Sequence, residues 1–326
     1  KTTQGNIVTI LNPQSGKILD NFIITKEKNH NFTIPKVIQL PISNIITYSS
    51  TYLSFIDILN EIKKVKGITY SKGIKNTKVL KQISEKHTID IGSGEQADKE
   101  LILSLKPNLA MIYPSNGNHD WYSSFKIPTI TNVEYLEIHP LAQAEWIKLY
   151  GILLDKELLA DSIFKSIESK YNTLKTVINK THYSTKPTVL CGELFEGNWT
   201  LPSGKSFTNQ LISDAGGNYF YKQDTNTGSK KIDFETILAK DSIIDFWILL
   251  SFDKNEITKT RLKEKNDRYK YLSILKTNKI GVCNTAKNNY FEKGILEPHV
   301  LLSDISNLLH PSSKNNSYTY FKQIDE

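Results

Sequence analysis

The sequence is poor in cysteine and has no long apolar run. Its two cysteines, Cys191 and Cys283, are too few for a disulfide scaffold and form no zinc-binding motif. We interpret both as small buried hydrophobic residues, with a disulfide between them as the alternative. No stretch approaches the roughly 20 apolar residues that a membrane-spanning helix requires. These absences indicate a folded protein whose core is made by ordinary apolar packing.

Charge clusters and catalytic motifs are also scarce. Lys and Arg outnumber Asp and Glu by 41 to 34, a net charge of +7. No basic block is interleaved with aromatic residues, so we expect no nucleic-acid partner. The sequence shows no Ser-His-Asp order, no paired carboxylates and no close pair among its 7 histidines. Nothing in it therefore argues for an enzyme, for a bound metal ion or for a cofactor.

The length of 326 residues suits two domains. Hydrophobic residues make up 39% and charged residues 23% of the chain, which is a globular composition. The sequence begins at Lys1 without an initiator methionine or an apolar leader. We interpret this as a processed N-terminus, so the missing leader does not argue for a cytoplasmic location.

Strand-like and helix-like segments alternate in both halves of the chain, which predicts an α/β fold with parallel sheets. Residues 6–25 predict a hairpin around a turn at 12–16. Further predicted strands are 37–40, 45–48, 68–70, 109–113, 129–130, 188–192, 243–250 and 279–283. Further predicted helices are 51–64, 76–86, 98–105, 206–215, 233–239, 267–274 and 297–309.

Residues 139–181 break this alternation. Their apolar residues recur at helical spacing, with a joint at Asp155, and the second predicted helix has about 25 residues. A helix of that length extends roughly 37 Å, enough to span two lobes. We therefore predict an N-terminal lobe at 1–138, a helical crossover at 139–183 and a C-terminal lobe at 184–326.

Two glycine-rich motifs resemble nucleotide-binding loops. Residues 92–97 read GSGEQA, but the preceding strand is short and polar, and the acidic residue expected about 20 positions later is missing. Residues 204–206 read GKS, but Trp199 stands where a phosphate-binding loop needs its first glycine. We interpret the first motif as a plain loop and Ser206 as the N-cap of the following helix.

An ordered set of segments resembles the class III periplasmic substrate-binding proteins of ABC importers, the receptors for iron–siderophore complexes, haem and vitamin B12. The segments are ELILSLKPNL at 100–109, FEGNWTLPSGKS at 195–206, NQLISDAGGN at 209–218 and EPHVLLSDI at 297–305. The resemblance covers roughly residues 35–311, and the N-terminal hairpin and Tyr290-Phe291 are similar to the Bacteroidetes branch of the family.

The resemblance implies two Rossmann-like lobes joined by a single long backbone helix, with the ligand cleft between the lobes. It also implies a docking role for one surface glutamate of each lobe. Glu100 and Glu235 match the two family positions that contact arginines of the permease. Such ion pairs fix the relative orientation of the two partners and raise the association rate more than they raise the affinity. The alternative for both is a helix N-terminal acid that only stabilises its own helix.

Candidate ligand residues come partly from the resemblance and partly from position. Tyr113 matches a cleft aromatic of the vitamin B12 receptor and Tyr70 lies close to another, whereas Gly94 and Ser229 occupy the approximate places of its two cleft tryptophans. Aromatic residues suit a planar ligand, and lysines suit an anionic one. The full set is Tyr70, Tyr113, His119, Trp121, Phe195, Trp199, Lys205, Tyr290 and Phe291.

The expected function is that of a periplasmic or lipid-anchored receptor. It would bind an iron complex, for which a ferric siderophore is our first choice, and deliver it to an ABC permease with its ATPase. We expect a monomer in which iron is present only as part of the ligand. Haem or a cobalamin is the close alternative, and an enzyme on a two-lobe fold, such as a chelatase or dehydrogenase, is the alternative of another class.

Overall fold

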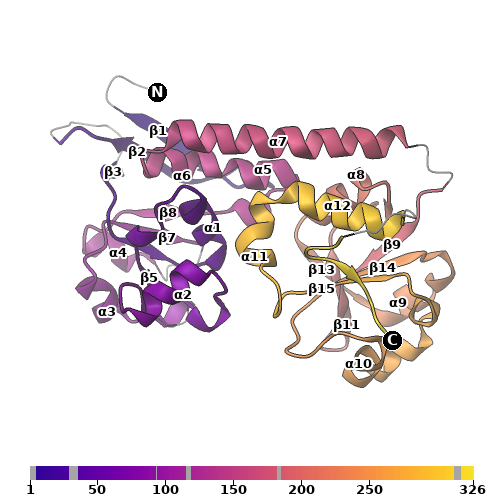
Figure 1. Ribbon diagram of the computed structural model, residues 1–326. Coiled ribbons are helices and arrows are strands. Elements are labelled where there is room, and N and C mark those ends of the chain that lie inside the picture. The colour runs from indigo at the N-terminus through magenta and orange to yellow at the C-terminus, as the bar shows by residue number, and fades with distance from the viewer. Residues whose placement is uncertain (1–4, 29–35, 93, 115–118, 182–184, 312–316) are drawn as a thin grey trace. The chain divides into compact units, whose positions relative to one another are not determined.

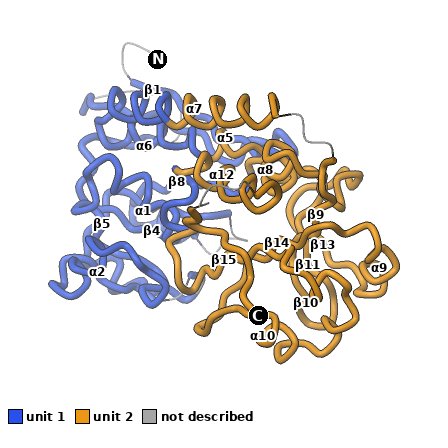
Figure 2. The backbone as a smooth tube through the Cα atoms, turned by 45° about the vertical axis from the view of Figure 1, so that its right-hand side comes forward, with its two compact units in different colours: residues 1–136, 144–166, 291–296 blue, residues 137–143, 167–290, 297–326 orange. Residues whose placement is uncertain are grey.

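The computed structural model describes residues 5–28, 36–92, 94–114, 119–181, 185–311 and 317–326. They form two compact units (Figures 1 and 2). Unit 1 comprises residues 1–136, 144–166 and 291–296, and unit 2 comprises 137–143, 167–290 and 297–326. The return of residues 291–296 to the unit formed by the first half of the chain was not indicated by any sequence pattern.

Unit 1 is built on a parallel sheet in the order β6-β5-β4-β7-β8. Its strands are β4 (Ile45–Thr47), β5 (Val65–Ile68), β6 (Ile89–Asp90), β7 (Leu109–Ile112) and β8 (Thr129–Thr131). A second sheet of three strands contains the predicted hairpin, β1 (Asn6–Leu11) and β2 (Ile18–Thr25), with β3 (Val37–Gln39) parallel to β2.

The helices of unit 1 begin where polar side chains cap them. Asn76 accepts the backbone N–H of Lys78 and Val79, and Asp98 accepts that of Leu101 at 2.8 Å. The helices are α1 (Ser50–Ile58), α2 (Thr77–Ser84), α3 (Lys99–Ser104), α4 (Trp121–Ser124) and α6 (Ile147–Leu153). Short 3-10 turns are η1 (Ile62–Lys64), η2 (Ser71–Gly73), η3 (Gly94–Gln96), η4 (Glu134–Leu136) and η8 (Gly294–Leu296).

Three helices contain points where the chain passes from one unit to the other: α5 (Pro140–Glu145), α7 (Glu157–Lys180) and α11 (Tyr290–Lys293). α7 has 24 residues and matches the predicted long helix. The predicted joint before it is also present, because Asp155 adopts a positive φ of 59° between α6 and α7. Within unit 2, buried Asp214 accepts Tyr171 Oη of α7 at 2.7 Å and pairs with Lys175 Nζ at 2.9 Å.

Unit 2 contains a sheet in the order β12-β9-β14-β15-β16, parallel except for its last strand. The strands are β9 (Thr188–Cys191), β12 (Asn218–Tyr219), β14 (Phe246–Ser251), β15 (Ile280–Asn284) and β16 (Lys322–Gln323). All residues of β15 are buried, as expected of a parallel strand covered on both faces. The helices and 3-10 turns are α8 (Phe207–Asp214), α9 (Phe234–Leu238), α10 (Lys259–Lys265), α12 (Pro298–Leu309), η5 (Asp241–Ile243), η6 (Asp267–Tyr271) and η7 (Ser273–Lys276).

The predicted α/β class with parallel sheets is therefore confirmed in each unit, but one local prediction is wrong and one sheet was not predicted. Residues 267–274, predicted as a helix, form two 3-10 turns separated by Leu272, whose backbone is extended. The sheet that was not predicted has three antiparallel strands, β10 (Glu193–Phe195), β11 (Asn198–Pro202) and β13 (Ser229–Asp233). A two-residue turn with positive φ at Glu196 and Gly197 joins its first two strands.

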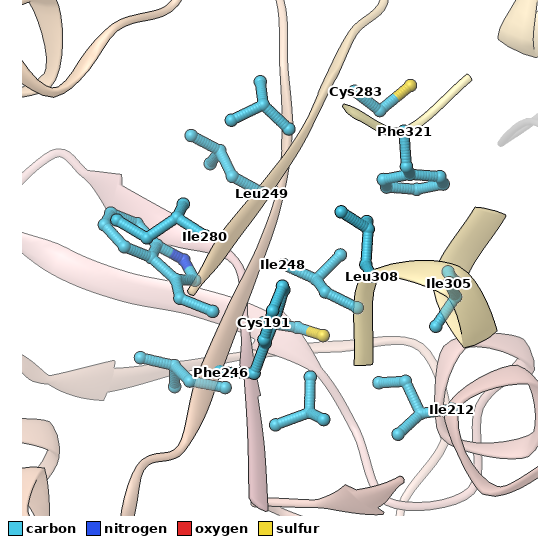
Figure 3. Packing of buried hydrophobic residues seen from close by; sticks show 14 of the residues in the cluster. Cys191, Ile212, Phe246, Ile248, Leu249, Ile280, Cys283, Ile305, Leu308 and Phe321 are labelled. Carbon is cyan, nitrogen blue, oxygen red and sulfur yellow. The ribbon is translucent and has the colours of Figure 1, made fainter. Parts of the chain in front are cut away.

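The main apolar cluster of unit 2 includes side chains of the five-stranded sheet, α8 and α12, some of which are shown in Figure 3. Cys191 and Cys283 are both buried in it and are not joined by a disulfide, which confirms the interpretation as small hydrophobic residues. The C-terminal segment is held by Asp304 of α12, whose carboxylate accepts the backbone N–H of Thr319, Tyr320 and Phe321. That anchor places the Phe321 ring inside the same cluster.

Candidate functional site

A group of tyrosines gathers at the carboxyl edge of the unit 1 sheet. Tyr48 follows β4, Tyr70 follows β5 and Tyr113 follows β7. The carboxyl ends of parallel strands lie at one edge, which is where open α/β sheets bind their ligands. Tyr70 is 60% exposed, whereas Tyr113 is partly buried and Tyr48 is buried. The edge therefore presents phenol side chains from three strands.

The hydroxyl groups of Tyr70 and Tyr113 converge on Gly94. A Cβ atom at Gly94 would lie 2.8 Å from Tyr113 Oη and 3.2 Å from Tyr70 Oη. Glycine is thus required there for the two rings to take these positions. Tyr70 itself adopts a left-handed backbone with a φ of 56°, which is uncommon for a non-glycine residue. The arrangement brings two phenol oxygens from separate strands to one place.

His119 and Trp121 extend this group toward α4. The His119 ring is buried and lies edge-on to Tyr48 at 4.7 Å and to Tyr113 at 5.6 Å between centroids. Trp121 stacks on Tyr122 at 4.0 Å. Four predicted residues, Tyr70, Tyr113, His119 and Trp121, therefore belong to one group with Tyr48 and Tyr122. We call these six residues the tyrosine edge.

The buried phenols of the tyrosine edge stay protonated. Burial raises the pKa of both Tyr48 and Tyr122, whose hydroxyl groups share a hydrogen bond of 3.1 Å. A cavity of about 590 Å³ adjoins the edge and is lined by Tyr113 and His119 together with Lys36 and Lys126. Lys36 is already paired with buried Asp20, whose second oxygen accepts the Thr131 N–H at 3.1 Å.

Unit 2 contains a smaller and more apolar cavity of about 310 Å³. It lies among β9, β10, β11, β14, α8 and α12. Two predicted ligand residues, Phe195 and Tyr290, line it. The Phe195 ring is 58% exposed, and Lys231 Nζ lies 5.8 Å from its centroid. We call this cavity the unit 2 pocket.

One polar group of the unit 2 pocket is held by a hydrogen-bonded cluster. Oε2 of Glu193, at the start of β10, lies 3.4 Å from Lys265 Nζ of α10. Ser251 Oγ, at the end of β14, donates to Glu193 Oε2 at 3.1 Å and accepts from Lys265 Nζ at 3.0 Å. This ion pair fixes the carboxylate of Glu193 at the pocket wall. The wall therefore carries an anionic oxygen beside its apolar side chains.

The remaining predicted ligand residues do not join these groups. The interpretation of Trp199 as a ligand contact needs correction, because its side chain is fully buried and its Nε1 donates to the Cys191 carbonyl at 2.8 Å. Lys205 is exposed and does not line the unit 2 pocket. Phe291 belongs to unit 1, although its neighbour Tyr290 belongs to unit 2, so the predicted pair is divided.

Sequence reasoning also missed one residue that matters here. Tyr48 completes the tyrosine edge, but it stands at the end of the predicted strand 45–48 and was not selected, whereas Tyr122 was noted as an aromatic residue near a predicted strand end. The available signal for Tyr48 was an aromatic residue at the end of an apolar strand, whereas Tyr113 was selected by the family resemblance. Among the described residues, His, Cys, Asp and Glu nowhere gather in threes that could hold a metal ion.

The two predicted docking acids lie on different units. Glu100 is exposed in the first turn of α3. Glu235 is exposed in the first turn of α9, where it forms an ion pair with Arg268. Its own backbone N–H and the Arg268 guanidinium hold the pKa of the Glu235 carboxyl below its usual range. Both carboxyl groups are exposed on the protein surface.

Comparison with known proteins identifies a family and a relative. A sequence model of the family described as "Periplasmic binding protein" matches residues 45–280. An uncharacterized lipoprotein of Methanocaldococcus jannaschii is 28% identical over 296 residues, which are 88% of this chain and 69% of that protein.

Solved structures give the same result at the level of the fold. A periplasmic binding protein from Veillonella parvula aligns with a TM-score of 0.70 at 13% identity, covering 95% of this chain and 100% of that one. A periplasmic heme binding protein from Pseudomonas aeruginosa gives 0.66 at 14%, covering 88% and 99%. An ABC-type Fe3+-hydroxamate transport system from Saccharomonospora viridis gives 0.65 at 15%, covering 93% and 99%.

Each α/β unit contains a cavity lined in part by aromatic residues. The match over residues 45–280 shows that the chain belongs to the periplasmic binding protein family. Binding rather than catalysis is the activity of this family. The family and the lipoprotein relative indicate an extracytoplasmic protein. Within the part of the chain that the structure describes, every helix is too short or too polar to span a bilayer.

Proposed function

We propose that the protein binds a ferric siderophore and delivers it to an ABC permease, as a receptor held outside the cytoplasm by a lipid anchor. The observation that carries the proposal is the convergence of the Tyr70 and Tyr113 hydroxyl groups on Gly94 at the carboxyl edge of the unit 1 sheet. Siderophores surround iron with anionic oxygens, and phenol hydroxyl groups can donate charge-assisted hydrogen bonds to them. The name of the Saccharomonospora viridis structure supports this class of cargo.

The tyrosine edge also supplies apolar surface. His119 and the Trp121–Tyr122 stack offer flat faces beside the hydroxyl groups, and the organic shell of a siderophore packs against such faces. In unit 2, Phe195 and Tyr290 offer a second aromatic surface at the unit 2 pocket. The proposed ligand contacts are thus Tyr70, Tyr113, His119 and Trp121 in unit 1 and Phe195 and Tyr290 in unit 2.

A haem receptor is the second candidate, favoured by the same two hydroxyl groups. Tyrosine can ligate haem iron directly, and Tyr70 is exposed enough to reach a bound ligand. The Pseudomonas aeruginosa structure is described as a heme binding protein. The two candidates predict different absorption spectra for the bound complex. Haem iron coordinated by tyrosine has a tyrosinate charge-transfer band, which a hexadentate ferric siderophore does not acquire.

Replacing Tyr70 and Tyr113 with phenylalanine tests the proposal. Each variant should bind a ferric siderophore at least about tenfold more weakly, because a hydrogen bond to a charged oxygen contributes roughly 1.5–3 kcal/mol. Titration calorimetry with a panel of ferric hydroxamates and catecholates measures the change. Tyr135→Phe is the matched control, since Tyr135 is a 56% exposed tyrosine of unit 1 outside the tyrosine edge. Equal affinities of all three variants and the parent protein would contradict the proposed contacts.

The docking proposal has a separate test. Glu100→Gln combined with Glu235→Gln should abolish uptake of siderophore-bound iron in cells that carry the cognate permease, while ligand affinity stays within about twofold. Docking acids affect the orientation and the association rate of the receptor on the permease, and they do not contact the ligand. Glu85→Gln with Glu264→Gln is the matched pair, because both acids are exposed, one in each unit, and Glu264 also pairs with an arginine. Normal uptake by the first pair would show that docking lies elsewhere.

A further inference from the structure

The unit 2 pocket has a chemistry of its own that the family does not assign. We propose that it binds an uncharged aromatic ring bearing a hydroxyl group, as a phenol-like substituent of the cargo. The inference deepens the proposed function and rests on it, since the ring belongs to the siderophore.

The size of the pocket restricts what can enter. A volume of about 310 Å³ is at the lower end of small-molecule sites. It accommodates a single substituted ring and excludes a whole porphyrin or corrin. The occupant is therefore one group of a larger ligand, or a fragment by itself.

The walls favour an aromatic occupant. Four aromatic side chains line the pocket: Phe195, Phe207, Tyr290 and Phe321. Tyr290 already meets Phe321 edge-on, with centroids 6.1 Å apart and an interplanar angle of 88°. A further ring can extend this edge-to-face packing, which contributes roughly 0.5–1.5 kcal/mol per pair beyond area burial. The remaining apolar walls are Leu201, Leu211, Ile212, Ile248, Leu250 and Ile305.

A polar atom at the wall selects for a hydroxyl substituent. Thr200 lines the pocket, and its buried Oγ1 has no hydrogen-bond partner among the described residues. A buried hydroxyl group without a partner is costly, so a ring oxygen that bonds to Thr200 Oγ1 removes that cost.

The electrostatics of the wall exclude an anionic occupant. Burial raises the pKa of the Cys191 thiol, so this lining group is neutral. Glu193 is the charged residue of the lining, and its carboxylate repels a benzoate or a fatty acid. Lys265 is engaged by that carboxylate and by Ser251. A neutral phenol meets no such repulsion and can donate to the carboxylate.

The test uses 4-fluorophenol as the probe, followed by ¹⁹F NMR titration of the full chain. We expect saturable binding with a dissociation constant of roughly millimolar order, as suits a fragment of this size. Fluorobenzene should bind about fivefold more weakly, because it cannot bond to Thr200, and 4-fluorobenzoate should not saturate. No saturable binding of 4-fluorophenol, or tighter binding of 4-fluorobenzoate or hexanoate, would overturn the proposal.

Variants locate the bound probe. Thr200→Val should weaken 4-fluorophenol about fivefold and leave fluorobenzene unchanged, a pattern that general loosening of the pocket would not give. Ser229→Trp should block both probes, because Ser229 is exposed on β13 at the pocket lining. Leu250→Trp, at another partly exposed lining position, serves the same purpose if the first variant does not fold. Binding that both blocking variants leave intact would place the probe elsewhere and refute the site.

The ferric-siderophore panel separates this inference from the proposed function. If siderophores bind to the parent protein but 4-fluorophenol does not, the pocket assignment fails and the receptor function stands. If 4-fluorophenol binds in a Thr200-dependent way but no siderophore binds, the pocket stands as a hydroxyaryl site and the receptor function fails.

Discussion

Trp199→Ala is expected to lower the free energy of unfolding by about 3–5 kcal/mol, the range for truncation of a large aromatic residue in a core. The Trp199 side chain is fully buried, and its ring centroid lies 5.4 Å from that of Trp247 and 6.0 Å from that of Tyr269. Its Nε1 also donates to the Cys191 carbonyl, which the variant leaves without that partner. Urea denaturation followed by circular dichroism measures the loss.

Phe195→Ala is the matched control for this prediction. Phe195 stands four residues away on the neighbouring strand β10, but its ring is 58% exposed. Its removal should change stability by less than about 1 kcal/mol and should weaken ligand binding instead. If Trp199→Ala retained full stability and lost ligand affinity, Trp199 would be a ligand contact and the buried position described here would be wrong.

Glu134→Gln is expected to stabilise the protein at pH 8 by up to about 3 kcal/mol and to leave it unchanged at pH 4. Glu134 is 3% exposed, and its Oε2 has no hydrogen-bond partner among the described residues. The titratable groups that face it are tyrosines: Tyr52 from α1, Tyr150 from α6 and the adjacent Tyr135. Burial raises the pKa of Glu134 to about 7.

The sign follows from proton linkage. Between about pH 4.5 and 7 the folded protein holds a proton on Glu134 that the unfolded chain releases, so stability falls as pH rises through this window. Each pKa unit corresponds to about 1.4 kcal/mol, and the full loss is reached above pH 7. The glutamine variant stays neutral and lacks this slope.

Chemical denaturation between pH 4 and 8 measures the difference between Glu134→Gln and the parent protein. Glu168→Gln provides the control, because Glu168 is exposed on α7 and its replacement should give parallel curves. Parallel curves for Glu134→Gln as well would mean that the Glu134 carboxyl is ionised in the folded protein at a cost too small to detect.

Much of the fold could be predicted because local signals agreed with tertiary packing. Ser206 accepts the Asn209 N–H at the start of α8, and Gly216 follows the end of that helix with a φ of 82°, as the sequence indicated. The antiparallel sheet of unit 2 was not predicted, although polar Thr200 stands between apolar Trp199 and Leu201. The structure shows the same alternation in the burial of these three residues. The turn of this sheet at Glu196-Gly197 has a glutamate where asparagine or aspartate is the usual signal.

The candidate site was predicted in part, because sequence order indicates which residues follow strands but not how deeply they are buried. Tyr113 was selected by the family resemblance and His119 by its position after a predicted strand, and they do lie together. The position of Trp199 in a motif after a strand suggested an exposed ring, yet the alternation of β11 turns it into the core. The convergence of Tyr70 and Tyr113 on Gly94 depends on three separate strands, so no local pattern contains it.

Quenching of intrinsic tryptophan fluorescence by a panel of cargo complexes tests the central proposal most directly. Trp121 lies in the tyrosine edge, stacked on Tyr122 and only partly buried, so a coloured iron complex bound there should quench it. The proposal predicts saturable, submicromolar quenching by a ferric siderophore and none by its iron-free form, with cobalamin, Zn²⁺ and NAD inactive. Quenching by haemin alone would select the haem receptor. Silence toward every ferric siderophore together with a saturable response to Zn²⁺ or NAD would contradict the receptor proposed here.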